Sequence, residues 1–247
     1  MRSLLRIAGL LASTAVFASD PGSFDRTLNV TGTVELDAKS DRGGVYITVG
    51  STATVRIRAI IKPVYGRLDL DLADANIRAL EKNPPIEQIG NRIRIGYQKD
   101  PALMRGVSMR LEIETPPATQ IRAQTVSGGI RIDGVLGSLT TETISGRTEI
   151  KAAGGPIRAE SRSGAIQIAQ GIPAPIRART KSGRITAELA KQGGYQVDAR
   201  SDSGKVSGDA TSDRKQGADR RRLQKQIGAP GGPLVDLAAH SSEIEIN

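Results

Sequence analysis

The sequence predicts an all-β protein, a parallel β-solenoid of about six rungs preceded by a strand-rich part with one short helix. Three observations lead to this prediction. A Ser-Gly pair recurs every 18 to 21 residues, at Ser127, Ser145, Ser163, Ser182 and Ser203, and a degenerate Ser241-Ser242 pair follows. Each pair lies between two short stretches of alternating residues, which is typical of strands. Aromatic residues make up only 2% of the chain, which suits a narrow interior filled by Ile, Val, Leu and Ala.

The first residues are typical of an export signal. Arg2 and Arg6 give a positive start, residues 7–17 are mainly apolar, and Val16-Phe17-Ala18 is an acceptable cleavage site. We therefore expect residues 1–18 to be a signal peptide and the protein to reach the periplasm or the cell surface. The alternative is a buried N-terminal helix. This apolar run is too short for a permanent membrane span and no later run approaches that length, so we expect no transmembrane segment in the mature chain.

Residues 19–117 are predicted to be a β-rich part that continues into the solenoid. Alternating apolar and polar residues between Thr27 and Ile61 predict strands separated by Gly-containing turns. Two more strands are expected at 91–97 and 107–114.

One short helix is expected in this part, at Asp74–Lys82. Asp74 is a suitable capping residue, and Ile77 and Leu80 would face inward. The helix must end before Pro84-Pro85, because proline cannot continue it.

The Ser-Gly repeats fill residues 118–247. Side chains on a strand alternate between its faces, so alignment on the Ser-Gly pair predicts four inward columns. Three precede the pair: Ile121, Leu139, Ile157, Ile176, Val197 and Val235; Ala123, Thr141, Ala159, Ala178, Ala199 and Leu237; Thr125, Thr143, Ser161, Thr180, Ser201 and Ala239. The fourth follows it: Ile130, Thr148, Ile166, Ile185, Val206 and Ile244.

The Ser-Gly pair itself is interpreted as a tight corner. Gly tolerates a positive φ there, and the Ser hydroxyl can satisfy a backbone group, so stacked corners predict a ladder of hydroxyls. In the last repeat Ser242 replaces Gly, and we expect this atypical unit to cap the stack. Residues 210–233 are polar and basic and predict an exposed loop.

Several of these segments resemble a known family. The shared features are the Ser-Gly repeats, the NPPIEQIGNRIRIGY segment (Asn83–Tyr97), the LEIETPPAT link (Leu111–Thr119) and the GAPGGPLVDL lead-in (Gly228–Leu237). Together they resemble the bacterial β-strand-repeat "putative adhesin" family, a domain of unknown function related to auto-transporter adhesin-like head domains. The resemblance covers essentially the whole mature chain. It implies an exported, non-enzymatic parallel β-solenoid, while the basic charge and weakened last units depart from the family pattern.

The sequence predicts no metal site and no cofactor. It has no Cys, a single His and no D-x-D-x-D-G calcium loop. Neither Gly43-Gly44 nor Gly154-Gly155 is followed by the Lys-Ser/Thr of a phosphate loop.

Catalysis has little support. A Ser-His-Asp arrangement would have to use His240 with Asp236 and Ser241, and no G-x-S-x-G elbow accompanies them. We interpret His240 as solvent-facing on a capping rung. The rival hypothesis is a carbohydrate-active β-helix enzyme, whose candidate carboxylates are Glu142 and Glu160. We interpret both as solvated charges.

The remaining candidate is a basic face. The chain carries a net charge of +9, which favours anionic partners. Seven cations are predicted to project from adjacent rungs on one face: Arg158, Arg162, Arg177, Arg179, Lys181, Arg184 and Arg200. The function predicted is an adhesin-like or structural envelope module that contacts anionic polysaccharide or a cell-envelope surface. An ordinary solubilising face is the plainer alternative.

Two further points limit the choice of partner. Nucleic acid is not expected, because export and the lack of interleaved aromatics argue against it. A periplasmic scaffold or sensor that binds a protein through an exposed edge stays open. The oligomeric state is not predicted.

Overall fold

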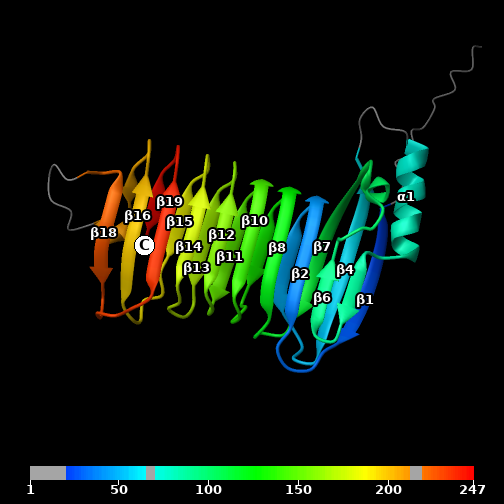
Figure 1. The fold of residues 1–247 in the computed structure, drawn as a ribbon, viewed down its shortest axis with the longest axis horizontal. Coiled ribbons are helices and arrows are strands. Elements are labelled where there is room, and N and C mark those ends of the chain that lie inside the picture. The colour runs from blue at the N-terminus through cyan, green and yellow to red at the C-terminus, as the bar shows by residue number, and fades with distance from the viewer. Residues whose placement is uncertain (1–20, 65–69, 212–218) are drawn as a thin grey trace, which may run out of the picture.

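The computed structural model describes residues 21–64, 70–211 and 219–247, and in these ranges the chain forms a flat parallel β-solenoid (Figure 1). The proposed signal peptide, residues 1–18, lies outside the described residues. Two sheets of ten strands each face one another in this part of the chain. We call the sheet that holds the strand before each Ser-Gly pair the leading sheet, and the other the trailing sheet.

Each predicted repeat forms one rung, a leading strand followed by a trailing strand. The rungs in chain order are β8 (Gln120–Ser127) with β9 (Ile130–Asp133), β10 (Leu139–Ser145) with β11 (Thr148–Ala153), β12 (Ile157–Ser161) with β13 (Ile166–Gln170), β14 (Ile176–Thr180) with β15 (Ile185–Glu188), β16 (Tyr195–Ser201) with β17 (Val206–Ser207), and β19 (Leu234–Ala239) with β20 (Ile244–Ile246). Neighbouring rungs pair in parallel with the register that the alignment predicts, as for Leu139 opposite Ile121 and Ile157. The predicted fold class is therefore confirmed.

The four predicted inward columns form the core. All 24 positions are buried, and none exposes more than 8% of its surface. Apolar columns stack directly on one another, so each rung buries its apolar side chains against its neighbours, as a solenoid requires. Two positions break the apolar pattern, since Thr141 and Thr148 of the same rung are both fully buried and their hydroxyls have no hydrogen-bond partner.

The corner glycines are needed for a different reason from the one predicted. Positive φ angles occur at other glycines and not at Gly128, Gly146, Gly164, Gly183 or Gly204. A Cβ at Gly164 would instead lie 1.7 Å from the carbonyl oxygen of Gly146 in the preceding rung, and one at Gly146 would lie 1.9 Å from that of Gly128. Close stacking of backbone on backbone therefore leaves no room for a Cβ at these glycines without a backbone shift. The last repeat accommodates one, since Ser242 stands at the corner position and its hydroxyl donates to the Gly183 carbonyl at 2.5 Å.

The hydroxyl ladder also lies elsewhere. The Ser-Gly serines are exposed, whereas the buried Thr and Ser two positions earlier close the corners. Thr125 Oγ1 donates to the Gly128 carbonyl at 2.9 Å and forms a second hydrogen bond with the Thr143 hydroxyl at 3.0 Å. Ser161 Oγ accepts from the Gly164 N–H at 2.8 Å. The buried hydroxyl column, not the Ser-Gly serine, is thus what holds the corner.

The solenoid begins well before residue 118. β2 (Glu35–Arg42) pairs in parallel with β8, and β3 (Val45–Val49) pairs in parallel with β9, so they form a rung of their own. Its corner reads Arg42-Gly43 in place of Ser-Gly, and the Gly43 carbonyl is the atom that excludes a Cβ at Gly128. Strands β6 (Arg92–Ile95) and β7 (Val107–Thr115) add a further parallel layer beside this rung.

Antiparallel strands and one helix cover the N-terminal end of the stack. β1 (Gly22–Asn29) and β4 (Thr54–Pro63) extend the trailing sheet beyond β7, and β5 (Ile86–Ile89) extends the leading sheet beyond β6. Helix α1 (Leu70–Lys82) stands against β1 and β4, and a 3-10 turn, η1 (Pro101–Met104), lies near it (Figure 1).

The predicted helix is confirmed, with one correction. Ile77 and Leu80 are buried, and the helix ends at Lys82 before the two prolines. It begins at Leu70, so Asp74 lies inside it and does not cap it. Asn76 fixes the helix to the η1 turn by donating to the Ala102 and Arg105 carbonyls at 3.1 and 3.0 Å.

The prediction that the last repeat caps the stack is wrong. β19 lies between β14 and β16, so the final repeat is inserted between the two that precede it in the chain (Figure 1). The predicted loop 210–233 is also partly wrong, because it contains β18 (Arg222–Ile227), which pairs antiparallel with β16 and forms the outer edge. A short turn, η2 (Asp209–Thr211), precedes it, and residues 212–218 of the predicted loop lie outside the described residues.

This exchange of rungs explains the glycine-rich lead-in to the last repeat. The chain must pass outward at Gly193-Gly194 and return beside it at 228–232. A Cβ at Gly194 would lie 1.8 Å from the Ala229 carbonyl oxygen, and a Cβ at Gly232 would lie 1.9 Å from that of Gly194. The two crossing segments therefore touch backbone to backbone.

Candidate anion-binding groove

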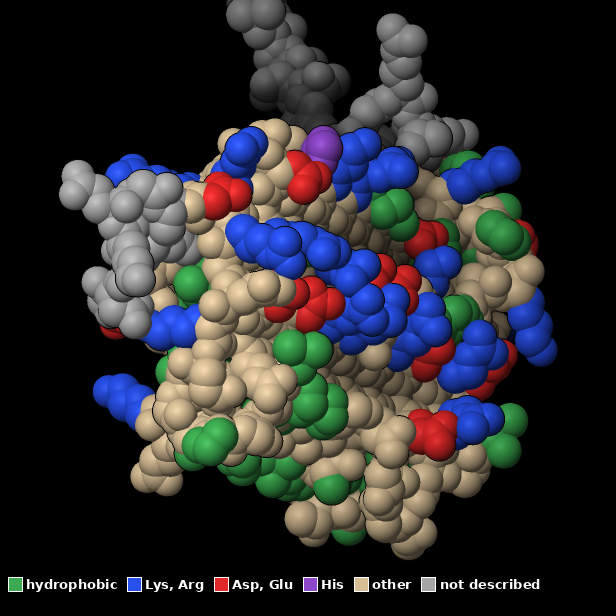
Figure 2. Space-filling model, turned by 60° about the vertical axis from the view of Figure 1, so that its left-hand side comes forward, with side chains coloured by type: hydrophobic (Ala, Val, Ile, Leu, Met, Phe, Trp, Pro, Cys, Tyr) green, Lys and Arg blue, Asp and Glu red, His purple; other side chains and the backbone are tan. Residues whose placement is uncertain are grey.

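Outward side chains of the leading sheet stand in columns that run along the solenoid axis. Between two of these columns lies an open groove of about 1060 Å³. Its outward lining is formed by Lys39, Gln124, Val126, Glu142, Ile144, Glu160, Arg162, Arg179, Lys181, Arg200, Asp202, Ala238 and His240. Figure 2 shows Lys and Arg side chains in a band across the molecule, with Asp and Glu among them.

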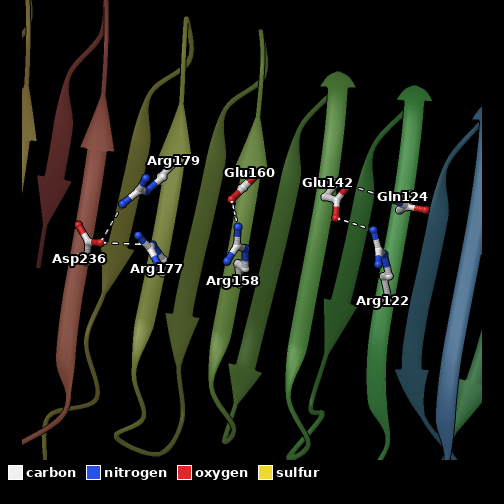
Figure 3. Close-up of polar contacts among 8 residues, drawn as sticks. All are labelled: Arg122, Gln124, Glu142, Arg158, Glu160, Arg177, Arg179 and Asp236. Carbon is white, nitrogen blue, oxygen red and sulfur yellow. Dashed lines mark hydrogen bonds and ion pairs between the residues drawn. The ribbon is translucent and has the colours of Figure 1, made fainter.

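Ion pairs engage the cations along one side of the groove (Figure 3). Arg122 pairs with Glu142 of the next rung at 3.0 Å, and Arg158 pairs with Glu160 of its own strand at 2.7 Å. Asp236 is shared by Arg177 at 3.4 Å and Arg179 at 3.3 Å. Such exposed pairs add little stability, but they remove free positive charge from this strip.

Three cations inside the groove remain unpaired. Arg162, Lys181 and Arg200 make no ion pair with any residue in the described ranges. Arg162 and Lys181 follow one another in the outermost column, on adjacent rungs about 4.8 Å apart. Arg200 lies two rungs beyond Arg179 in the neighbouring column. Free positive charge is therefore concentrated near the C-terminal end of the groove.

The other end of the groove is apolar and closed by paired charges. Val126 and Ile144 expose 42% and 46% of their surface in the column that continues as Arg162 and Lys181. Beyond them, Lys39 pairs with Asp41 at 3.4 Å and lies 5.9 Å from the centre of the Tyr97 ring. The groove thus changes from apolar to cationic along its length.

Tyr97 anchors this apolar end. Its hydroxyl donates to Asp37 at 2.7 Å, and the Arg94 guanidinium stacks 4.2 Å from the ring centre. Burial, and then the hydrogen bond to Asp37, raises the pKa of the Tyr97 hydroxyl well above its ordinary value. The phenol therefore stays neutral and serves as a donor.

The seven predicted cations do not all share one surface. Arg162, Arg179, Lys181 and Arg200 line the groove, and Arg158 and Arg177 lie along its side. Arg184 follows the corner and pairs with Glu243 at 3.2 Å. Contacts from Ser207, Lys205 and Arg184 lower the pKa of the Glu243 carboxyl. Arg184 is thus part of a separate cluster, in which it shares Glu243 with Lys205.

His240 is not on a capping rung, because its strand lies inside the stack. Its Nδ1 lies 2.7 Å from Oδ2 of Asp202, and both side chains are largely exposed. Asp236, the partner considered from the sequence, contacts arginines instead. The pairing with Asp202 could not be found from the sequence, because Asp202 comes from the repeat that precedes β19 in the chain but follows it in space.

The carboxylates of the rival enzyme hypothesis are engaged in charge pairs. Glu142 and Glu160 are register partners on adjacent rungs. Glu142 accepts from Arg122 and also from Gln124, and Glu160 accepts from Arg158. No group of three or more His, Asp or Glu in the described ranges is placed to hold a metal ion. Within the same ranges, no helix has the length and apolarity needed to cross a membrane.

Similarity to known proteins agrees with this fold. The profile of the family described as "Toastrack DUF4097" matches residues 105–247. A "putative cell adhesion protein" from Clostridium sporogenes has a similar structure, with a TM-score of 0.52, 14% identity, and coverage of 92% of this chain and 99% of that chain. A "putative adhesin" from Bacteroides fragilis has a TM-score of 0.42 and 15% identity over 91% of this chain and 97% of that chain. No curated protein matches this chain. The resemblance predicted from the repeats is confirmed.

Proposed function

This chain belongs to the Toastrack DUF4097 family, and we propose that it is an exported, non-enzymatic, adhesin-like envelope module that holds anionic glycans at the cationic end of its groove. The observation that carries this proposal is the contrast between paired and unpaired cations on the leading sheet. In the described ranges Arg162, Lys181 and Arg200 have no acidic partner, while the arginines beside the groove each contact a carboxylate.

The arrangement suits an extended polymer more than a compact ligand. The groove is open and runs along the axis, so its cations recur at multiples of the rung spacing of about 4.8 Å. Unpaired Arg and Lys side chains offer charge-assisted hydrogen bonds to carboxylate, sulfate or phosphate groups. Attraction of this kind is screened by salt, because the Debye length falls from about 10 Å at 0.1 M to about 3 Å at 1 M.

The contacts of the candidate catalytic groups support a non-enzymatic role. Glu142 and Glu160 each face an arginine, and His240 faces Asp202 with no nucleophile in hydrogen-bond contact among the described residues. Hydrolysis of a glycosidic bond needs one protonated and one ionised carboxyl group. Glu142 and Glu160 have like surroundings, each with an arginine, so nothing in their contacts sets one apart as the acid.

The binding proposal is tested with two variants of equal net charge. The groove variant replaces Arg162, Lys181 and Arg200 by Gln, and the flank variant replaces Arg122, Arg158 and Arg177 by Gln. Affinity for an anionic polysaccharide, polygalacturonate, is measured at low and high salt, with neutral dextran as the control polymer. We expect the groove variant to bind at least about tenfold more weakly at low salt. The flank variant is expected to lose clearly less, because it keeps the three free cations of the groove although it leaves Glu142 and Glu160 without their arginines.

Two results would contradict the proposal. One is equal loss in both variants, which would show that only net charge matters. The other is wild-type binding that does not weaken as salt is raised. Export is tested separately by fractionating the native host, and recovery of the chain with residues 1–18 intact in the cytoplasm would contradict that part.

A further inference from the structure

One position in the groove interrupts a column of long side chains. On the leading sheet this outward column contains Lys39, Gln124, Glu142, Glu160, Arg179, Ala238 and Arg200, in spatial order. Ala238 is directly opposite Arg179 on one side and Arg200 on the other. Because adjacent strands lie about 4.8 Å apart, the two arginine backbones are about 10 Å apart across this gap. The space above Ala238 can therefore hold a ligand group, whereas on the neighbouring rungs a long side chain fills the same position.

Positive groups surround this gap. Arg179 and Lys181 come from the rung on one side and Arg200 from the rung on the other, and all three line the groove together with Ala238. His240, on the same strand as Ala238, also lines it, and its Nδ1 is taken by Asp202. The Nε of Arg179 has no hydrogen-bond partner among the described residues.

The carboxylates near the gap are each already engaged. Asp236 is shared by Arg177 and Arg179, Glu160 pairs with Arg158, and Asp202 contacts His240. Asp198, in register with Asp236, accepts from Gln224 and has no ion pair in the described ranges, so Asp198, Asp202 and Asp236 stand against Arg177, Arg179, Lys181 and Arg200 around the gap. Lys181 and Arg200 have no such partner in the part of the chain that the structure describes. The balance of free charge at the gap is therefore positive.

We propose that a phosphomonoester group carried by an envelope glycan sits over Ala238, between Arg179 and Arg200 and against Lys181. A phosphomonoester is tetrahedral and carries a charge of about −1.5 to −2 at pH 7, with three acceptor oxygens. Its oxygens can contact cations on two rungs and at one side at the same time, whereas a carboxylate carries a single charge and its two oxygens lie in one plane. The inference rests on the proposed glycan binding and adds the chemical group and its position.

The direct test uses His240 as a reporter, because it is the only histidine of the chain. Its ring-proton NMR signal is followed while inorganic phosphate is added to the purified chain, against sodium chloride at equal ionic strength and fixed pH. Two variants are compared. Ala238→Gln fills the gap without changing charge, and Thr140→Gln makes a similar change on the outer face of the same sheet, outside the groove.

We expect a saturable shift with phosphate in the wild type and in Thr140→Gln, and none in Ala238→Gln. Affinity for phosphorylated dextran falls about tenfold in Ala238→Gln, the equivalent of one lost charge-assisted hydrogen bond. Asp202→Asn removes a nearby negative charge and is expected to tighten this binding. A purely structural role of Ala238 would not predict that gain.

Other outcomes overturn the inference. Unchanged phosphate binding in Ala238→Gln would show that the gap is not the site. Binding to phosphatidic acid vesicles without binding to phosphorylated dextran would assign the group to a lipid and contradict the glycan source. If the groove variant loses polygalacturonate binding while Ala238→Gln keeps every phosphate response, this inference fails and the proposed function stands. If the groove variant keeps full polymer binding, the proposed function itself fails.

Discussion

The Ser-Gly corner and the outward column beside it are two residues apart in every repeat, yet different forces act on them. At the five Ser-Gly corners, the carbonyl of the neighbouring rung occupies the place of a Cβ, so a side chain there requires a backbone shift. In the outward column, Val126, Ile144, Arg162 and Lys181 follow one another on successive rungs without disturbing the stack. The fold thus depends on the residues that recur in every repeat, and the chemically varied residues are confined to the outward positions between them.

The largest effect is expected at a corner. Gly146→Ala places a Cβ 1.9 Å from the Gly128 carbonyl oxygen, and the rungs must separate to admit it. We expect destabilisation by about 3 kcal/mol or more, or a melting temperature lower by roughly 10 °C. Ser145→Ala is the matched control, because this exposed serine lies outside the buried hydroxyl column, and a change within about 0.5 kcal/mol is expected. Thermal unfolding of both variants checks the difference, and equal losses would show that the serine matters as much as the glycine.

A gain in stability is expected inside the same rung. The Thr148 hydroxyl is buried without a partner, so Thr148→Val removes an unsatisfied polar group and is expected to stabilise by about 1 kcal/mol. Thr143→Val is the control, because its hydroxyl is hydrogen-bonded to that of Thr125 in the adjacent rung. That change is expected to destabilise by about 1 kcal/mol. Denaturant unfolding measures both, and a loss of stability in Thr148→Val would contradict the account of this core position.

The smallest effect is expected at the Glu243 cluster and depends on pH. The pKa of this carboxyl is lowered on folding, so its contribution to stability is present above the ordinary value near 4.5 and is lost as pH falls through the lower folded value. Glu243→Gln is therefore expected to be slightly less stable than the wild type at neutral pH and equally stable at strongly acid pH. Melting temperatures across this range check the trend. A difference that grows toward acid pH would contradict it.

The sequence predicts the core of this molecule better than its ends. Every inward column follows from the spacing of Ser127 and its equivalents, because side chains alternate between the two faces of a strand. The rung at 35–49 escapes that pattern because Arg42-Gly43 stands in place of Ser-Gly, although Leu36, Ala38 and Ser40 repeat the inward columns. The position of the last repeat could not be predicted, since spacing along the chain does not record that β19 enters between β14 and β16.

The sequence predicts which residue types form the candidate site, but not which of its cations pair with carboxylates. Repeats rich in Arg and Lys indicate a basic surface, but which cations are free depends on neighbours in other rungs. Arg184 pairs with Glu243 and Arg177 with Asp236, and both partners lie more than fifty residues away in the chain. The gap at Ala238 becomes visible only when Arg179 and Arg200 are known to lie on either side of it.

The most direct test of the central claim compares two changes within one rung. Gly164→Ala and Arg162→Gln are each examined by thermal unfolding and by binding to polygalacturonate at low salt, at a temperature where both are folded. The account predicts that Gly164→Ala lowers the melting temperature and leaves the binding of the folded protein nearly unchanged, while Arg162→Gln weakens binding at an unchanged melting temperature. If Arg162→Gln unfolds the protein as readily as Gly164→Ala, or leaves binding intact, the separation between fold and function in the repeat is contradicted.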